Sequence, residues 1–190
     1  MVFNEDIFKR VSETGGSIEV ICGSMFSGKT EELLRRLNRA RIARLDVQIF
    51  KPKTDTRYDE NAVVTHNMQS FPCVAIDNSA SILLLYNNEH VVAIDEAQFF
   101  DSNLTEVCNT LANRGVRIIV AGLDMDFKGR PFGPMPELMA VAESVTKLHA
   151  VCVRCGNPAL NSYRLIAGDD KIVLGETETY EPRCRNCYNS

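Results

Sequence analysis

Residues 23–30, GSMFSGKT, match the pattern G-x-x-x-x-G-K-[ST], which is typical of phosphate-binding loops, or P-loops. Glycines let the backbone of such a loop turn its N–H groups inward toward phosphate oxygens. Lys29 would reach the β- and γ-phosphates of a nucleoside triphosphate, and the Thr30 hydroxyl would bind Mg²⁺. The residues expected to bind ATP and magnesium here are Gly23, Ser24, Met25, Phe26, Ser27, Gly28, Lys29 and Thr30.

A second candidate lies at residues 91–98, where four apolar residues are followed by Asp95 and Glu96. In many P-loop proteins, a buried strand of this kind carries a carboxylate to the magnesium ion. Asp95 is the expected magnesium group, and Gln98, in the same segment, is counted with the ATP and magnesium site. Glu96 is the expected general base, because a carboxylate there can accept a proton from the group that attacks the γ-phosphate. A purely structural Glu96, as a cap or ion-pair partner, is the alternative.

A charged loop at residues 53–58 follows a predicted strand at residues 46–50. Ligands of open parallel sheets collect beyond the carboxyl ends of the strands. Asp55 and Arg57 are therefore expected near phosphates or Mg²⁺, and an ordinary solvent-exposed loop is an equally good interpretation of this composition.

Two Cys-x-x-Cys pairs near the C-terminus are separated by residues 156–183. Four thiolates close a tetrahedral shell around Zn²⁺, so the pattern predicts a structural zinc rather than a catalytic one. The intervening loop is a candidate lid over a second substrate, and a stabilising or interaction role is the simpler alternative. Within it, strand-like pieces at residues 163–165 and 171–174 are expected to pair as a ribbon. The proposed zinc ligands are Cys152, Cys155, Cys184 and Cys187.

Strands and helices that would position these groups alternate along the chain, which predicts a parallel sheet covered on both faces. We expect a nucleotide-binding domain over residues 1–150 and a zinc-binding domain over residues 151–190. The predicted strands are 17–22, 46–50, 71–76, 91–94, 116–121 and 145–151, and the predicted helices are 31–44, 79–87, 104–112 and 137–143.

The composition limits the classes of partner. With 190 residues, 45% of them hydrophobic, the chain can form one domain and a small appendage. A net charge of −4 and a pI near 5.4 do not provide the basic surface that nucleic-acid binding requires. Residues 1–14 lack the apolar stretch of a secretory signal, and no apolar run approaches membrane-spanning length. We therefore expect a cytoplasmic protein without a nucleic-acid or membrane partner.

We consider four functional classes for a chain with a P-loop and two cysteine pairs. A helicase-type ATPase needs a second motor domain and a cationic channel, and an acidic chain of 190 residues provides neither. A GTPase would normally show Asn-Lys-x-Asp, and no Asn-Lys pair occurs here. A zinc-ribbon nucleic-acid binder would leave the P-loop unexplained. A small-molecule kinase needs one P-loop, one base, an acceptor pocket and a cover that excludes water, and this chain has a candidate for each.

Several segments together resemble the zinc-containing, cytosolic type II thymidine kinases, in order from about residue 17 to residue 188. They are the P-loop, KxDTRY at 53–58, DEAQFF at 95–100, RPFG at 130–133, AESV at 142–145, the paired cysteines and Tyr180. The resemblance implies transfer of the γ-phosphate of ATP to the 5′-hydroxyl of thymidine, giving thymidine monophosphate and ADP. The expected fold is α/β, with a P-loop (RecA-like) parallel sheet flanked by helices and a small C-terminal zinc ribbon carrying a lasso loop.

The resemblance also assigns roles to individual residues, among them Glu96 as proton acceptor. It implies that a lasso-like loop between the cysteine pairs closes over thymidine and binds the base largely through backbone groups. A homotetramer and feedback inhibition by thymidine triphosphate (dTTP) are implied as well. Apart from the resemblance, aromatic and apolar residues in loops would supply a flat slot for a heterocycle, although ordinary packing is the simpler interpretation of each residue alone. The expected nucleoside site comprises Met25, Phe99, Leu123, Phe127, Phe132, Lys171, Ile172, Val173, Leu174, Gly175 and Tyr180.

Overall fold

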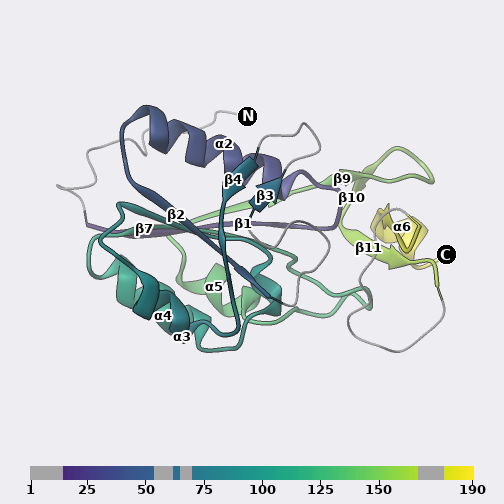
Figure 1. Cartoon of the computed structure of the whole chain (residues 1–190). Coiled ribbons are helices and arrows are strands. Elements are labelled where there is room, and N and C mark those ends of the chain that lie inside the picture. Colours follow the sequence, from purple (N-terminus) through teal and green to yellow (C-terminus); the bar gives the residue numbers. More distant parts are fainter. Residues whose placement is uncertain (1–14, 54–61, 65–69, 167–177) are drawn as a thin grey trace.

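A six-stranded parallel sheet forms the centre of the computed structural model, which describes residues 15–53, 62–64, 70–166 and 178–190. The strand order is β5-β2-β6-β7-β1-β8, and neighbouring strands pair in parallel throughout (Figure 1). This confirms the predicted α/β class. The strands are β1 (Ser17–Gly23), β2 (Val47–Pro52), β5 (Val74–Ile76), β6 (Val91–Ile94), β7 (Arg117–Gly122) and β8 (Ser144–Leu148).

Helices cover both faces of the sheet, with α2 on one side and α3, α4 and α5 on the other (Figure 1). Apolar residues at helical spacing explain why α2 forms and which face it buries: Leu33, Leu34, Leu37 and Ala40 are all buried. The helices are α2 (Lys29–Ile42), α3 (Ala80–Leu85), α4 (Leu104–Ala112) and α5 (Met135–Val141).

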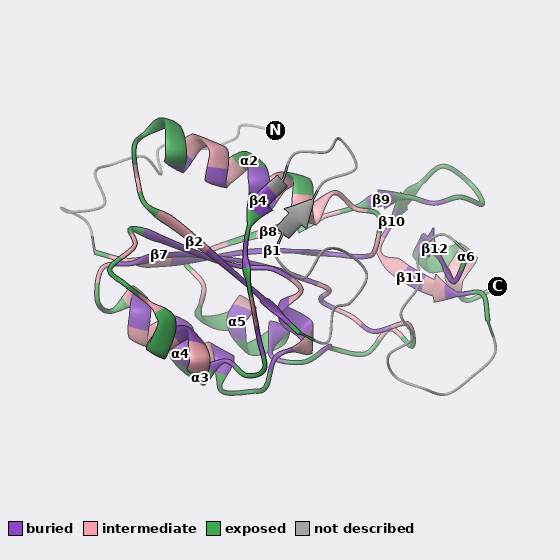
Figure 2. Ribbon diagram, in the orientation of Figure 1, coloured by how far each residue is buried: buried purple, intermediate pink, exposed green. Residues whose placement is uncertain are grey.

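The hydrophobic core has two layers because the central strands are buried on both faces (Figure 2). Adjacent residues of β1 point to opposite sides: Ile21 packs in the layer under α2, and Cys22 packs in the layer with α4 and α5. Every residue of β6 is buried, which explains why this strand reads as a continuous apolar run rather than an alternating one.

Two predicted strands are each divided in the structure. The segment 71–76 breaks at Cys73, directly after Pro72, and its first part pairs with β3 outside the main sheet. The segment 145–151 leaves the sheet after Leu148, and its last residues pair with the first cysteine loop. The shorter strands are β3 (Ala62–Val64), β4 (Ser70–Pro72), β9 (Ala150–Val151) and β10 (Pro158–Ala159).

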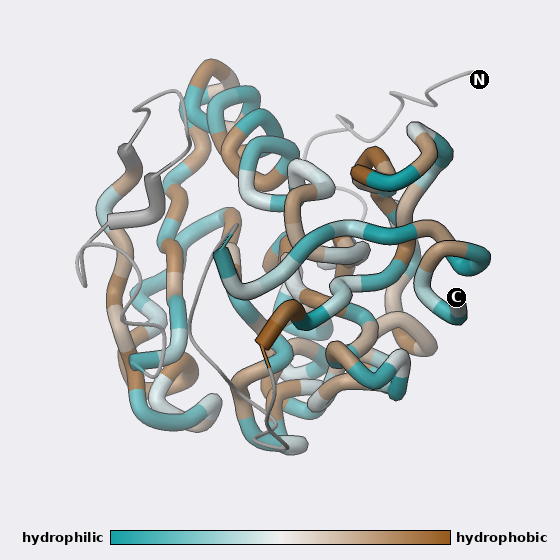
Figure 3. The backbone as a smooth tube through the Cα atoms, turned by 90° about the vertical axis from the view of Figure 1, so that its right-hand side faces the viewer, coloured by the Kyte–Doolittle hydropathy of each residue, from teal (hydrophilic) through white to brown (hydrophobic). Residues whose placement is uncertain are grey.

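The C-terminal ribbon is formed by two strands of the described part of the chain. β11 (Asn161–Arg164) pairs antiparallel with β12 (Tyr180–Arg183), and the predicted pairing of residues 163–165 with residues 171–174 falls outside the described residues. β12 is followed directly by Cys184 and α6 (Arg185–Tyr188), so the second cysteine pair lies beside the first. The ribbon lies at the end of the molecule that faces the viewer in Figure 3.

Some predictions concern residues outside the described part of the chain. These are the N-terminal residues 1–14, Asp55 and Arg57 of the charged loop, and the lasso residues 171–175. Among the residues that the structure does describe, no helix is long and apolar enough to cross a membrane.

Candidate nucleotide site and metal centre

The P-loop connects the carboxyl end of β1 to the first turn of α2, and its backbone departs from ordinary conformations at three residues. Gly23, Phe26 and Gly28 have φ values of 145°, 62° and 83°. A Cβ at Gly23 would lie 2.3 Å from the Leu148 carbonyl oxygen, so only glycine fits there. Left-handed residues of this kind turn successive N–H groups toward one concave side, which suits an anion at the N-terminus of α2.

Side chains within the loop fix its shape. The Lys29 Nζ and the Ser27 hydroxyl both donate to the carbonyl oxygen of Ser24, at 2.8 and 2.7 Å. Lys29 therefore lies over the loop, with its ammonium group on the side of the chain that the P-loop motif assigns to phosphates.

Asp95 and Glu96 follow β6, two strands away from the P-loop strand, with β7 between them. The Asp95 N–H still donates to Phe50 of β2 at 3.0 Å, and the Asp95 side chain is buried. Its Oδ1 accepts from the Glu96 N–H at 2.9 Å. Glu96 itself has a left-handed backbone, with φ 51° and ψ 40°, an uncommon and strained conformation for a residue with a side chain. This turn directs Glu96 away from the line of β6, so the carboxylates of Asp95 and Glu96 lie at different places.

Gln98, in the 3-10 turn η2 (Ala97–Phe99), is buried and uses both ends of its amide. Its Nε2 donates to Glu96 Oε2, and its Oε1 accepts from the Leu123 N–H at 2.9 Å. The structure therefore places this side chain between the Glu96 carboxylate and the end of β7.

The residues expected around the nucleoside fall into two groups. Phe99 and Phe132 meet edge to face, with ring centroids 5.7 Å apart. Phe127 forms the second group with Tyr180 and Arg164: the Arg164 guanidinium lies 3.4 Å from the centre of the Phe127 ring, and its Nη2 donates to the Tyr180 hydroxyl at 3.1 Å. Sequence reasoning did not single out Arg164.

Ser162 is a second contact that the sequence analysis missed. Its hydroxyl accepts from the Met25 N–H at 3.0 Å, and the Ser24 hydroxyl donates to the Ala159 carbonyl at 3.3 Å. Alternation along β11 places Ser162 and Arg164 on the same face of the ribbon, toward the P-loop and Phe127. The sequence analysis did not consider a pairing of β11 with β12, which is the register that sets the face of these two residues.

An ion pair crosses the end of β1 beneath the P-loop. Lys147 Nζ on β8 lies 2.6 Å from Asp124 Oδ2, just beyond β7, and the Asp124 side chain is buried. Burial, together with the nearby Asp124 charge, raises the pKa of the Cys22 thiol to about 11. Cys22 therefore remains a neutral thiol near pH 7, consistent with its position in the core.

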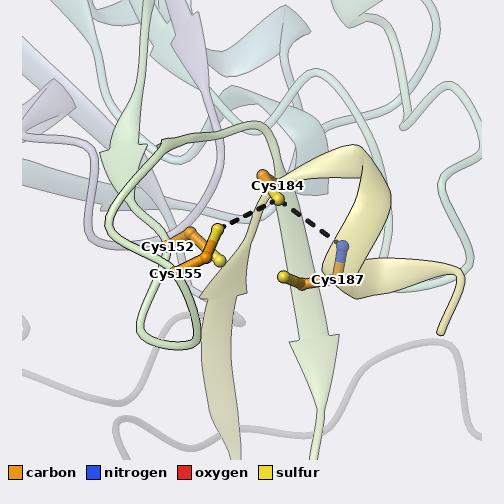
Figure 4. Close-up of side chains that lie close together, drawn as sticks. All are labelled: Cys152, Cys155, Cys184 and Cys187. Carbon is orange, nitrogen blue, oxygen red and sulfur yellow. Dashed lines mark hydrogen bonds between the residues drawn. The ribbon is translucent and has the colours of Figure 1, made fainter.

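The two cysteine pairs come together at the base of the ribbon (Figure 4). All four Sγ atoms lie within 4.8 Å of one another, and those of Cys155 and Cys184 are 3.6 Å apart. Gly156 has φ 75° and its N–H donates to the Cys152 carbonyl at 2.8 Å, which closes the tight turn of the first pair.

The donor set fits a soft divalent cation. A backbone hydrogen bond with Cys184 lowers the pKa of Cys152 to about 6, whereas hydrogen bonds with Cys155 and Cys184 raise the pKa of Cys187 to about 12. Crowded thiols of this kind cannot all ionise without a compensating charge. Four sulfur ligands around one point are the arrangement in which Zn²⁺ supplies that charge.

A P-loop at the start of a helix and a strand of the same sheet that ends in two carboxylates together define a P-loop nucleotide-binding protein. Comparison with known proteins then identifies the family. The family model "Thymidine kinase" matches residues 16–188. The chain belongs to the thymidine kinase family.

Individual relatives cover nearly the whole chain. The thymidine kinase of Bacteroides fragilis is 59% identical over 188 residues, which cover 99% of this chain and 94% of the relative. The thymidine kinase of Porphyromonas gingivalis is 62% identical over 173 residues, covering 91% and 85%. Among solved structures, the genome packaging NTPase B204 from Sulfolobus turreted icosahedral virus 2 has 14% identity over 70% of this chain and 74% of that one. Its TM-score of 0.47 is too low to inform function.

Proposed function

We propose that this protein is a thymidine kinase, which transfers the γ-phosphate of ATP to the 5′-hydroxyl of thymidine and gives thymidine monophosphate and ADP. The observation that carries the proposal is the family match over residues 16–188. The arrangement of the P-loop and of the two carboxylates after β6 supports this chemistry, because phosphoryl transfer depends on positioning and charge stabilisation.

At the phosphate end, the backbone N–H groups of the P-loop and the Lys29 ammonium bind the phosphates of ATP. Thr30 and Asp95 would hold the Mg²⁺ that accompanies the nucleotide, which would supply positive charge beside the phosphate oxygens. The buried position of Asp95 at the end of β6 suits that role. The charged-loop residues Asp55 and Arg57 add contacts to the phosphates, a role taken from the resemblance alone.

At the acceptor end, Glu96 accepts the proton of the 5′-hydroxyl as its oxygen bonds to the γ-phosphorus. The bond from that phosphorus to the bridging oxygen breaks, and ADP leaves with both electrons of the bond. A positioned base of this kind contributes about 10²–10⁴-fold to the rate.

We place the nucleoside beside Phe127, Tyr180, the Phe99–Phe132 pair, Met25 and Leu123, an assignment that follows the family resemblance. By the same resemblance, the lasso residues 171–175 would bind the base through their backbone and close over it as a lid. Excluding water in this way favours the sugar hydroxyl over solvent as the acceptor. The contact between the Arg164 guanidinium and Phe127 keeps this aromatic ring in place beside the ribbon.

The four cysteines would hold a structural Zn²⁺, and with this ion bound the ribbon of a C-terminal domain, residues 151–190, would be fixed against a nucleotide-binding domain, residues 1–150. Contacts of Ser162 and Ala159 with the P-loop support this role, since the ribbon and the phosphate site share hydrogen bonds. A homotetramer, feedback inhibition by dTTP and a cytoplasmic location, without nucleic-acid or membrane partners, complete the proposal on the basis of the family resemblance.

The test is an acceptor screen with the purified full chain, γ-labelled ATP and Mg²⁺. The panel contains thymidine, deoxyuridine, deoxycytidine and deoxyadenosine, with one reaction lacking any nucleoside. We expect labelled thymidine monophosphate and little release of phosphate without acceptor. Brisk hydrolysis in every reaction would instead identify an ATPase, and transfer only to deoxycytidine would identify a different nucleoside kinase.

A further inference from the structure

One amide side chain joins the Glu96 carboxylate to the neighbouring strand. Gln98 Nε2 donates to Glu96 Oε2, while Gln98 Oε1 accepts from the backbone N–H of Leu123 at 2.9 Å. The Leu123 N–H is part of the main chain at the end of β7, so it has a fixed direction. Only one orientation of the amide satisfies both contacts, because an N–H must face Glu96 and the oxygen must face Leu123.

Packing prevents this side chain from adopting another position. Gln98 is 2% exposed, and a glycine on β7 leaves room for its side chain. A Cβ at Gly122 would lie 2.9 Å from Gln98 Oε1 and 2.6 Å from Met135 Sδ, and a Cβ at Gly133 would lie 2.2 Å from the backbone carbonyl oxygen of Gln98. A buried amide with both ends hydrogen-bonded is a rigid support.

We propose that Gln98 is a positioning residue that holds the Glu96 carboxylate in the orientation needed to accept the proton of the acceptor hydroxyl. This inference rests on the proposed function of Glu96 and differs from a role of Gln98 in binding ATP or magnesium. The strained backbone of Glu96 makes such a support necessary, since a residue with φ 51° keeps that conformation only when its surroundings fix it.

The first experiment is the variant Gln98→Met, which keeps the length of the side chain and removes both hydrogen bonds. We expect kcat to fall by roughly 10–100-fold, because a small misplacement of a catalytic group has effects of that order. We expect the KM for ATP, and the dissociation constant of ADP with Mg²⁺, to change by less than about threefold. The matched control is Gln48→Met on β2, away from the site, which should leave all three constants unchanged.

The decisive measurement is a double-variant cycle with Glu96→Gln. If Gln98 acts through Glu96, then adding Gln98→Met to Glu96→Gln should lower kcat by no more than about twofold further. A Gln98→Met effect of the same size in both backgrounds would overturn the proposal. So would a normal kcat combined with weakened ADP binding, which would assign Gln98 to the nucleotide instead.

A second pair of variants covers the case in which Gln98→Met does not fold. Gln98→Glu keeps an acceptor for the Leu123 N–H and loses the donor toward Glu96, so kcat should again fall by about tenfold or more. The double variant Glu96→Gln, Gln98→Glu restores a hydrogen bond between the two side chains, in which residue 96 is now the donor and residue 98 the acceptor. It should melt within a few degrees of the wild type and remain as inactive as Glu96→Gln alone.

If the folded Gln98→Glu enzyme has a kcat close to that of the wild type, the positioning role is refuted. The wild type is measured with thymidine in the same assay, so failure of the proposed function would appear as an inactive wild type. Failure of the positioning role would appear only in the ratios between variants.

Discussion

The backbone N–H of Met25 in the P-loop donates a hydrogen bond of 3.0 Å to the hydroxyl of Ser162 on β11, across 137 residues of sequence. The nucleotide loop and the metal-binding ribbon are therefore in direct contact. Ser24 reinforces this contact through its hydrogen bond with the Ala159 carbonyl, at 3.3 Å. Because Met25 is a residue of the P-loop motif, a change in the position of the ribbon alters the backbone that would hold phosphate.

Ser162→Ala should loosen this contact. Removing the acceptor costs about 1 kcal/mol, which corresponds to roughly fivefold faster hydrogen exchange at the Met25 amide. Exchange measured residue by residue in the full chain checks this. Ser162→Thr keeps the hydroxyl and should retain most of the protection. Equal protection in the alanine variant would show that another group or water replaces the serine.

Removal of the metal should abolish kinase activity even though its four ligands lie outside the P-loop. The ribbon carries Ser162 and Arg164 on one face, so its unfolding releases both Met25 and Phe127. We expect one zinc ion per chain in freshly purified, reduced protein, and parallel loss of zinc and activity during treatment with a chelator.

The matched pair of variants for this prediction is Cys187→Ser and Cys108→Ala. The first removes a ligand and should lower the zinc content, whereas the second changes a buried thiol of α4 outside the cluster and should not. Activity that persists in zinc-free protein would contradict a structural role for the ion.

Lys29→Ala should damage turnover at least as severely as Glu96→Gln. Charge stabilisation dominates phosphoryl transfer, and loss of a general base costs about 10²–10⁴-fold. The two variants should differ in binding: calorimetric titration with ADP and Mg²⁺ should show weakened affinity for Lys29→Ala and nearly normal affinity for Glu96→Gln. Unimpaired turnover in Glu96→Gln would remove this residue from the mechanism.

Tyr180→Ala should raise the KM for thymidine more than the KM for ATP. The Tyr180 ring belongs to the group formed with Arg164 and Phe127, on the nucleoside side of the ribbon. Tyr180→Phe keeps the ring and removes the hydroxyl that accepts a hydrogen bond from Arg164, so it should have the smaller effect. Equal increases in both Michaelis constants for Tyr180→Ala would indicate general destabilisation.

Glu32 on α2 should make stability depend on pH in the acid range. Burial tends to raise the pKa of this carboxyl, but hydrogen bonds from Arg35 and Arg36 outweigh it and hold the pKa below its usual value of 4.5. A carboxyl with a lowered folded-state pKa contributes stability that is present above about pH 4.5 and is lost as the pH falls through the folded value.

Urea unfolding of the wild type and of Glu32→Gln, followed from pH 7 to pH 3, measures this contribution. The difference between the two midpoints should shrink steadily below pH 4.5. Glu31→Gln, in the same helical turn, controls for the loss of a carboxylate near a helix N-terminus. A difference that stays constant with pH would show that the arginines do not stabilise the ionised form.

Local patterns in the sequence determined much of the fold. Largely apolar runs marked β1, β6 and β7, and the helical spacing of Leu33, Leu34 and Leu37 marked α2, because these elements bury continuous apolar surface. The breaks at Cys73 and after Leu148 were less visible, because a strand that changes its pairing partner keeps the same residue types.

For the site, the sequence by itself determined the groups whose chemistry depends on local spacing: the P-loop, the carboxylates after β6 and the four cysteines. Tertiary structure alone decided the contacts between segments distant in the sequence. The ribbon partner of β11, the hydrogen bond from Met25 to Ser162 and the link from Glu96 through Gln98 to Leu123 all belong to this class. All three contacts have the same physical reason: register and chain packing set which polar groups meet, and residue type alone does not carry that information.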